Sequence, residues 1–379
     1  MTKGDSTTFM TRFGEVHTKG GDEVGGFDSL PIVDVANLGS SSVQERQLVA
    51  ADIFDVCKNV GFFYVKNHGI PQETIDTIHT MAAKFFALPD EVKMESYIGN
   101  SADINWQMSL EKGVKMESFS MGYERAADHQ RDLDDSPPSD PYNLHGPNQW
   151  PRDEAIPGFR EAYLRYHADV LEFSRKLIRI LALALDLPEE YFDKKVKDPG
   201  TNSRLVHYMA RDVSEERTTG LAPHTDCGCF TILSQNDVLG LQVLNGRNEW
   251  VNAQPIPGTF VVNLGDIFTY WTNGLFRSTH HRAINMTGEE RYSIPFFFSV
   301  GYNESVAPLQ EFVSEEKPPI KEEFVYGAVW LSSPCVPIEV LLTPNIVDEK
   351  NHASLELKGP PLRTSTVVFP LLPDGSHLP

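Results

Sequence analysis

The sequence predicts a mainly β protein with flanking helices, whose core is an antiparallel double sheet or jelly roll. Two features of the 379 residues predict this architecture. After Gly200, eight short runs rich in β-branched and aromatic residues alternate with turn residues over about 100 residues. Before Gly200, apolar residues recur mostly at helical spacing. A hydrophobic content of 40% suits a globular protein with a sizeable core.

The first part of the chain predicts helices joined by short strands. Residues 30–35, LPIVDV, indicate a strand, and residues 43–61 have apolar residues at helical spacing that end at a glycine. Residues 61–71 predict a buried strand and a turn. Residues 71–93 predict a helix that breaks near Pro89.

Residues 100–155 are polar and rich in proline, which predicts irregular structure, and a long helical pattern follows from about Pro157 to Leu187. The predicted strands of the core are the runs SRLVHYMA, CFTILSQ, LQVLN, EWVNAQ, FVVNLGDIF, TYWTNG, FRSTHHRAI and RYSIPFFFSV. The chain is therefore divided into a flexible tail at 1–27, a mostly helical region at 28–199, a jelly-roll core at 200–305 and a divergent C-terminal segment at 306–379.

The composition limits the kinds of binding partner and the cellular compartment that we expect for this protein. The formal net charge of −20 argues against nucleic acid or an anionic membrane as a partner, because both would repel such a surface. The N-terminal residues have no apolar signal core, and the most apolar helical stretch, at 177–187, is too short to span a bilayer. Four cysteines do not make a disulfide framework, so we predict a cytoplasmic protein.

A histidine and an aspartate two residues apart, His224-Thr-Asp226, stand at the start of an apolar run. On a strand, residues i and i+2 point to the same face with Cα atoms about 7 Å apart, so both side chains can reach one metal ion. His167-Ala-Asp169 has the same spacing inside a helical pattern, where the two side chains face opposite ways. We expect this second pair to be solvated or to cap the helix, and not to bind metal.

A catalytic metal needs a third protein ligand, and the downstream candidates are His280 and His281. Adjacent residues of a strand face opposite sides, so only one of them points inward. Two histidines and a carboxylate on one face of an ion leave three open positions, which is typical of non-haem Fe(II) oxygenases.

Cys227 and Cys229 have the opposite strand parity to Asp226, so we expect core cysteines, with a redox-sensitive pair as the alternative.

Arg291-Tyr-Ser293 again places two side chains on one face of a predicted strand. A buried guanidinium without an anionic partner is costly. Its planar fork matches a carboxylate with two hydrogen bonds, and a serine hydroxyl can add a third. The pair therefore predicts a site for a small carboxylate held near the metal. The alternative is an arginine paired with a surface acid at the edge of the strand.

These motifs together resemble a known family. His224-x-Asp226, Ser278-x-x-His281-Arg282-Ala283 and Arg291-x-Ser293 resemble the iron/2-oxoglutarate-dependent dioxygenases, in particular the branch of isopenicillin N synthase, ACC oxidase and the plant flavonoid and gibberellin oxygenases. The resemblance covers roughly residues 28–330. It includes LPIVDV, GFFYVKNHGIP, FFALPDEVK, SFSMGYE, GPNQWP, NLGDIFTYWTNG and FFFSVGY.

The resemblance implies a double-stranded β-helix core, a cupin-like jelly roll, with an N-terminal α/β region. It implies Fe(II), 2-oxoglutarate and O₂ as cofactor and cosubstrates, and the oxidation of a small organic molecule by hydroxylation, desaturation or ring formation in specialised metabolism. The implied metal ligands are His224, Asp226 and His281. The residues implied to bind the distal carboxylate of 2-oxoglutarate are Arg291, Ser293 and, on the preceding strand, Tyr208, which is followed by Met209 where the family usually has proline.

The substrate pocket is less well defined by the sequence. The aromatic candidates are Phe230, Phe298 and Tyr302, for which core packing is the more common role. The polar candidates in the irregular region are Asn105, Gln107 and Lys115.

Two other functions compete with the leading one. An oxidase of the isopenicillin N synthase type would use no 2-oxoglutarate, and Arg291 and Ser293 would bind the carboxylate of its substrate. A non-catalytic barrel could also bind a carboxylate, although it would not need all three metal ligands. Production of succinate discriminates the leading function from the oxidase.

Overall fold

The computed structural model describes residues 26–97, 116–128, 130, 144, 146–210 and 220–331, together with the backbone of residues 7–11, 14–18 and 108–111. Its helices are α1 (Val43–Asn59), α2 (Gln72–Phe86), α3 (Asp90–Met94), α4 (Phe159–Ala184), α5 (Asp266–Trp271) and α6 (Tyr326–Leu331), with 3-10 helices at Arg125–Ala127 and Gln310–Phe312. The predicted helices before residue 93 and the predicted long helix are confirmed by α1, α2, α3 and α4.

The main layer is an eight-stranded sheet in the order β3-β4-β11-β8-β13-β7-β6-β5. Its neighbours are antiparallel except for β3 and β4, which are parallel. The strands are β3 (Ile32–Asp34), β4 (Phe62–Lys66), β5 (Met108–Glu111), β6 (Met116–Gly122), β7 (Asn202–Tyr208), β8 (Phe230–Gln235), β11 (Thr259–Leu264) and β13 (Arg291–Phe298).

A smaller three-stranded sheet has the order β10-β9-β12. Its strands are β10 (Trp250–Asn252), β9 (Leu241–Leu244) and β12 (His281–Ala283). Two further pairs are β1 (Thr7–Thr11) with β2 (Gly14–Thr18), and β14 (Ser305–Val306) with β15 (Phe324–Val325). The two larger sheets are the predicted double sheet.

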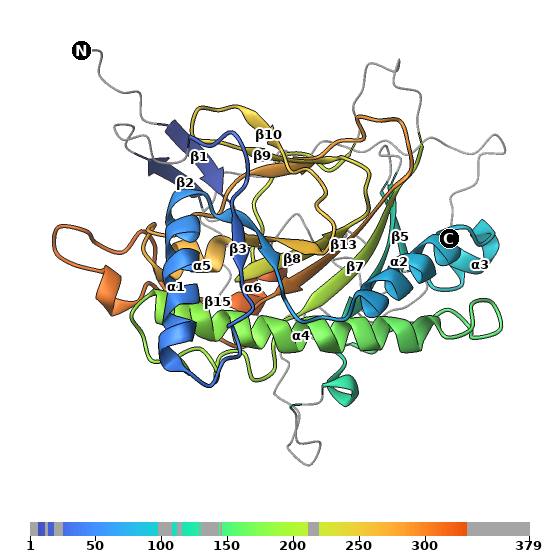
Figure 1. Ribbon diagram of the computed structural model, residues 1–379, viewed down its shortest axis with the longest axis horizontal. Helices are drawn as coiled ribbons and strands as arrows, with labels where there is room; N and C mark the ends of the chain where they lie inside the picture. The colour runs from blue at the N-terminus through green and yellow to red at the C-terminus, as the bar shows by residue number, and fades with distance from the viewer. Residues whose placement is uncertain are drawn as a thin grey trace, which may run out of the picture.

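The large sheet separates a helical face from an interior face. Helix α4 runs along one side of β7, β8 and β13, while β9 and β10 lie on the other side (Figure 1). On the helical face, the hydroxyl of Tyr163 in α4 donates a hydrogen bond to the carbonyl oxygen of Ser203 (2.9 Å). The ring of His167 in α4 lies 4.9 Å from that of Phe296 in β13. Buried apolar side chains between helices and sheet form the main core.

On the interior face, the two sheets contact each other through apolar side chains. Val206 and Tyr208 of β7 pack with Ala283 of β12. Phe62 of β4 packs in a second cluster with Val243 of β9. Residues that alternate along β7 therefore point either to the helices or to the space between the two sheets.

Two predictions of local structure are wrong. Residues 100–155 are not all irregular, because β5 and β6 extend the large sheet. β6 carries polar residues on both faces, and Glu117 is buried because it accepts hydrogen bonds from Lys93 (2.7 Å) and pairs with His207 (2.8 Å). Residues 269–274 are not a strand but the end of α5 and a turn. Residues on every side of this six-residue helix are buried, so its sequence shows no amphipathic period.

The ends of the chain are described only in part. The tail predicted at 1–27 contains the hairpin of β1 and β2, and its remaining residues up to 25 lie outside the described part. Residues 332–379 of the predicted C-terminal segment also lie outside it. No helix in the described part combines the length and the apolar character that crossing a bilayer requires.

We expect Gly61→Ala to lower the free energy of unfolding by about 3 kcal/mol, because it adds positive-φ strain to a steric overlap. Gly61 follows the end of α1 with φ +73°, and a Cβ there would lie 2.2 Å from the carbonyl oxygen of Arg277. Gly258→Ala is the matched control, since φ is also +73° but a Cβ meets nothing within 4 Å. Urea denaturation should show a loss of about 1 kcal/mol for the control. Equal losses would contradict the overlap with Arg277.

Candidate metal centre and carboxylate site

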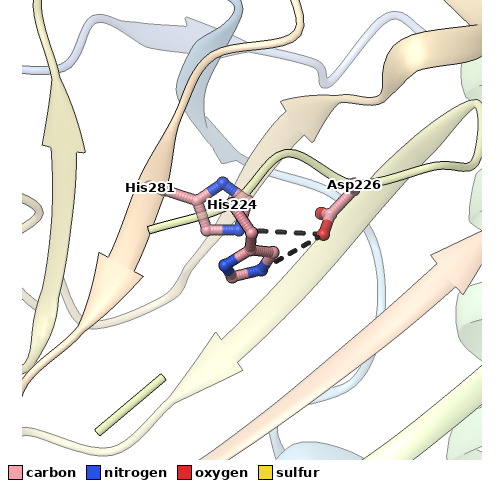
Figure 2. Close-up of side chains that lie close together, drawn as sticks. All are labelled: His224, Asp226 and His281. Carbon is pink, nitrogen blue, oxygen red and sulfur yellow. Dashed lines mark ion pairs between the residues drawn. The ribbon is translucent and has the colours of Figure 1, made fainter. Parts of the chain in front are cut away.

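Three side chains with metal-ligating atoms converge in the interior (Figure 2). The Nε2 atoms of His224 and His281 lie 3.6 and 3.8 Å from Oδ1 of Asp226. All three candidate ligand atoms lie within 4.8 Å of one another. Ligand atoms bound at about 2.1 Å to one ion are about 3 Å apart when the angle between the bonds is near 90°. Small movements of these side chains therefore suffice to hold a single metal ion.

The expected strand geometry of His224 and Asp226 is wrong in one respect. His224 forms only an isolated bridge with His281, and Asp226 lies outside any strand. The bridge has two backbone hydrogen bonds of 3.0 Å and brings the imidazole centroids to 4.2 Å. The carbonyl oxygen of Asp226 instead accepts from the amide of Asp266 (2.7 Å). The first amides of α5 need partners outside the helix, and the turn that carries Asp226 supplies one.

Hydrogen bonds fix the tautomers of both histidines. Nδ1 of His224 lies 2.8 Å from the carbonyl oxygen of Ala222, and Nδ1 of His281 lies 3.2 Å from that of Thr279. A carbonyl oxygen can only accept, so Nδ1 carries the proton in each bond. Each Nε2 then presents its lone pair toward the position of the ion, which is the arrangement that a metal requires.

The carboxylate of Asp226 is buried and held by two donors. The hydroxyl of Thr231 and the amide nitrogen of Asn263 donate to Oδ2, at 2.6 and 2.7 Å. Burial opposes the charged carboxylate, but His281, His224 and these donors outweigh it and lower the pKa of Asp226. Oδ1, the oxygen closest to both imidazoles, is left for a metal.

Thr231 and Asn263 were missed by the sequence-based search for site residues. The available signal was a polar residue inside an apolar strand, Thr231 in CFTILSQ and Asn263 in FVVNL. Both are almost fully buried, at 4% and 3% exposure. A buried polar side chain needs a partner, and here the partner is the carboxylate of the metal site.

The structure places His281, and not His280, beside the other two ligand candidates. The ring of His281 packs 5.1 Å from that of Phe62 on the large sheet, which directs it into the interior. The backbone carbonyl of His280 accepts a hydrogen bond from the amide of Leu244 (2.9 Å) in β9. His281 therefore supplies the inward side chain that alternating strand faces predict for one of the two histidines.

The comparison pair His167 and Asp169 takes no part in a metal cluster among the described residues. Asp169 accepts a hydrogen bond from Thr74 (3.2 Å) of α2. His167 is buried, with Nδ1 3.3 Å from the hydroxyl of Ser203. The expectation that this pair is solvated or caps the helix is therefore wrong for His167, because it falls on the face of α4 that covers β7.

Arg291 forms the second functional feature of the interior. It lies opposite Tyr208 in the register of β13 and β7, with Cζ 5.0 Å from the tyrosine ring centroid. Arg291 and Ser293 are 2% and 3% exposed. Nη2 of Arg291 donates to Gln235 (3.3 Å), whereas Nε and Nη1 are buried without a hydrogen-bond partner. Burial lowers the pKa of Arg291, and Tyr208 opposes that shift.

A guanidinium remains charged in proteins even when burial lowers its pKa. A buried cation with two unused donors has a large unmet requirement for an anion. No acidic side chain among the described residues forms an ion pair with Arg291, so the predicted edge ion pair is not what the structure shows. The position instead fits a carboxylate that comes from a small molecule.

Most of the remaining candidates lie in the core or outside the described part. Cys229 is fully buried, as expected of a core cysteine, whereas Cys227 is only partly buried, with Sγ 4.0 Å from the hydroxyl of Tyr326. The rings of Phe230 and Phe298 stack at 4.9 Å, so these residues belong to the core. The other aromatic candidate, Tyr302, is in the same core. The polar candidates Asn105, Gln107 and Lys115 lie outside the described residues.

Comparisons with known proteins agree with this arrangement. Residues 201–300 match the model of the 2OG-Fe(II) oxygenase superfamily, and residues 30–153 match that of the non-haem dioxygenase in morphine synthesis N-terminal region. A probable iron/ascorbate oxidoreductase of Dictyostelium discoideum is 36% identical over 73% of this chain and 82% of its own length. The 2-oxoglutarate-Fe(II) type oxidoreductase ppzC of Metarhizium majus is 33% identical over 76% and 82%.

Solved structures show the same fold. Neurospora crassa T7H in complex with alpha-KG superposes with a TM-score of 0.71 at 23% identity, over 81% of this chain and 96% of that one. JOX2 in complex with 2OG, Fe and JA superposes with a TM-score of 0.63 at 26% identity, over 81% and 86%.

A double sheet with a His-x-Asp and a distant histidine at its interior defines a mononuclear non-haem iron oxygenase. The chain belongs to the 2OG-Fe(II) oxygenase superfamily, in the branch with the morphine-synthesis type of N-terminal region. It is a 2-oxoglutarate-Fe(II) type oxidoreductase with Fe(II) and 2-oxoglutarate as cofactor and cosubstrate, and the donor set and the unmet guanidinium described above fit both.

We expect Thr231→Val to weaken Fe(II) binding about 10-fold or more, because it removes a donor that orients Asp226. Isothermal titration of the apo-protein with Fe(II) under anaerobic conditions measures the affinity. Thr225→Val is the control, since Thr225 lies between the two ligand candidates but donates to Asp266 (3.2 Å). A control that loses as much affinity as Thr231→Val would show that general disturbance, and not the orientation of Asp226, causes the effect.

Proposed function

We propose that His224, Asp226 and His281 bind the catalytic Fe(II), and that Arg291 binds the distal carboxylate of 2-oxoglutarate. The observation that carries the second assignment is the pair of buried, unused donors on Arg291. Tyr208 and Ser293 assist Arg291 in this proposal, since one lies opposite it and the other two residues along the same strand.

The two halves of the proposed site belong to one interior. Tyr208, opposite Arg291, packs against Ala283, which is two residues from His281 on β12. A dicarboxylate held by Arg291 at one end therefore extends toward the metal ligands at the other. This polarity favours 2-oxoglutarate, whose second carboxylate and keto group are metal-chelating oxygens.

Fe(II) with 2-oxoglutarate supplies the oxidising power of the reaction with O₂. The chain supplies position and environment. His224, Asp226 and His281 would hold the ion, which would leave coordination positions for cosubstrate and O₂. Thr231 and Asn263 hold the carboxylate of Asp226 in place. Burial of these groups excludes water from the reacting centre.

The enzyme acts on small molecules, as its superfamily relatives do. Within that class we propose hydroxylation, desaturation or ring formation on an organic molecule of specialised metabolism. JOX2, one of the similar structures, holds JA together with 2OG and Fe, which supports a substrate of that size.

The acidic composition supports the absence of nucleic-acid and membrane partners, and the cytoplasmic location stays a prediction.

We expect Arg291→Gln to weaken 2-oxoglutarate binding about 100-fold, because it removes a charge-assisted, two-pronged contact. The measurement is an anaerobic titration with Fe(II) and then 2-oxoglutarate, followed by the visible charge-transfer band of the chelated keto acid. Fe(II) affinity should stay at the wild-type value. Undiminished affinity for 2-oxoglutarate would refute the role of Arg291. Iron binding without any band in the wild type would instead favour the oxidase that uses no 2-oxoglutarate.

We expect His281→Ala to abolish the band and His280→Ala to retain it, because only His281 faces Asp226. The two neighbouring histidines make a matched pair for the same titration. The reverse result, in which His280→Ala loses the band and His281→Ala keeps it, would show that β12 is shifted by one residue.

A further inference from the structure

A second arginine of the large sheet points into the interior. On β7, the hydroxyl of Ser203 lies 3.3 Å from Nδ1 of His167 in α4, whereas Val206 packs against β12 of the small sheet. Successive residues of a strand point to opposite faces, so Arg204 shares the interior face with Val206 and Tyr208. The sequence patterns used to select Arg291 did not select Arg204.

Solvent reaches the interior around Arg204. The residues of β8 and β13 that face the helices, Ile232, Ile294 and Phe296, are fully buried at 0% exposure. On the interior face of the same strands, Leu233, Pro295 and Phe297 keep partial exposure, whereas Thr231 and Ser293 are buried. Arg204 is also partly exposed. The partly exposed residues lie around Arg204, so solvent reaches this part of the interior.

The guanidinium of Arg204 is only partly used by the protein. Nε donates to the hydroxyl of Ser120 (3.2 Å), which lies opposite it in the register of β6 and β7. Among the described residues no acidic side chain forms an ion pair with Arg204. By strand parity the side chain of Arg204 lies on the interior face, and it is separate from Arg291, which is buried beside Tyr208 at the far end of β7.

Strand register places Arg204 within reach of a molecule that touches the metal. Thr231, which bonds Asp226, pairs with Phe297, and Phe297 pairs with Asn202. From Thr231 on β8, the paired residue two strands away on β7 is Asn202, and Arg204 lies two residues further along β7. These steps correspond to about 7 Å along the strands and about 10 Å across them. An arginine side chain covers part of that distance, and a small substrate covers the rest.

We propose that Arg204, assisted by Ser120, binds a carboxylate of the primary substrate, so that this enzyme oxidises a small carboxylic acid. The proposal rests on the proposed function, in which Arg291 is occupied by 2-oxoglutarate and is not available to the substrate. The single positive charge of the guanidinium balances a single negative charge, and the hydroxyl of Ser120 is neutral. A phosphate dianion would remain half neutralised, which favours a carboxylate.

Paramagnetic broadening tests the proposal without a known substrate. Protein loaded with Mn(II) and 2-oxoglutarate is mixed with benzoate, phenylacetate, 3-phenylpropionate and hexanoate, and separately with the primary amide of each. Protons of a molecule near the metal are broadened in its ¹H NMR spectrum. We expect broadening by carboxylates and not by their amides, and a 10-fold or greater loss of affinity in Arg204→Gln. Arg204→Lys, which keeps the charge but not the fork, should give an intermediate affinity.

Arg160→Gln is the control, since Arg160 lies on α4 and pairs with Glu124 (2.6 Å). It should bind the carboxylates as the wild type does. Retention of the Fe(II)·2-oxoglutarate band in Arg204→Gln shows that the variant is folded and that the cosubstrate site is intact. With that band present, equal broadening by acids and amides, no broadening by any carboxylate, or unchanged affinity in Arg204→Gln would overturn the proposal. Absence of the band in the wild type would instead count against the proposed function.

Discussion

The backbone bridge between His224 and His281 is the constraint on which the site depends. It joins the segment before β8 of the large sheet to β12 of the small sheet. Because both partners of the bridge are also ligand candidates, the contact that closes the double sheet sets the separation of the two imidazoles. Asp226 completes the set from a turn that the first amides of α5 hold. The same backbone contact therefore joins the two sheets and brings the two histidines of the candidate metal site together.

Much of this site could be predicted from the sequence, because strand parity and ligand chemistry are local. The spacing of His224 and Asp226 predicted a shared ion, and Arg291 with Ser293 predicted a buried anion site. What failed depended on partners distant in the sequence. No pattern within residues 221–233 predicts that the backbone carbonyl of Asp226 accepts a hydrogen bond from the first turn of α5. The roles of Thr231 and Asn263 likewise appear only once β8 and β11 are paired.

The fold shows the same division between local and distant causes. Long elements such as α4 were predictable because their apolar period spans several turns. β6 was not, because its buried Glu117 is stabilised by Lys93 and His207, which come from other elements. A carboxylate in a strand resembles a loop residue until its hydrogen-bond partners are known. Short α5 was hidden for a different reason, since a helix buried all round has no polar face to reveal it.

The two interior arginines differ in burial, and this difference suits the two ligands proposed for them, 2-oxoglutarate for Arg291 and the substrate carboxylate for Arg204. Arg291 is nearly inaccessible and has no acidic partner among the described residues, so its charge is tolerable only when an anion is bound. Such a position suits a cosubstrate that is present in every turnover. Arg204 keeps partial contact with solvent, so it remains hydrated when the site is empty and incurs a smaller desolvation cost. An accessible cation of this kind suits a ligand that binds later, after Arg291 has been neutralised.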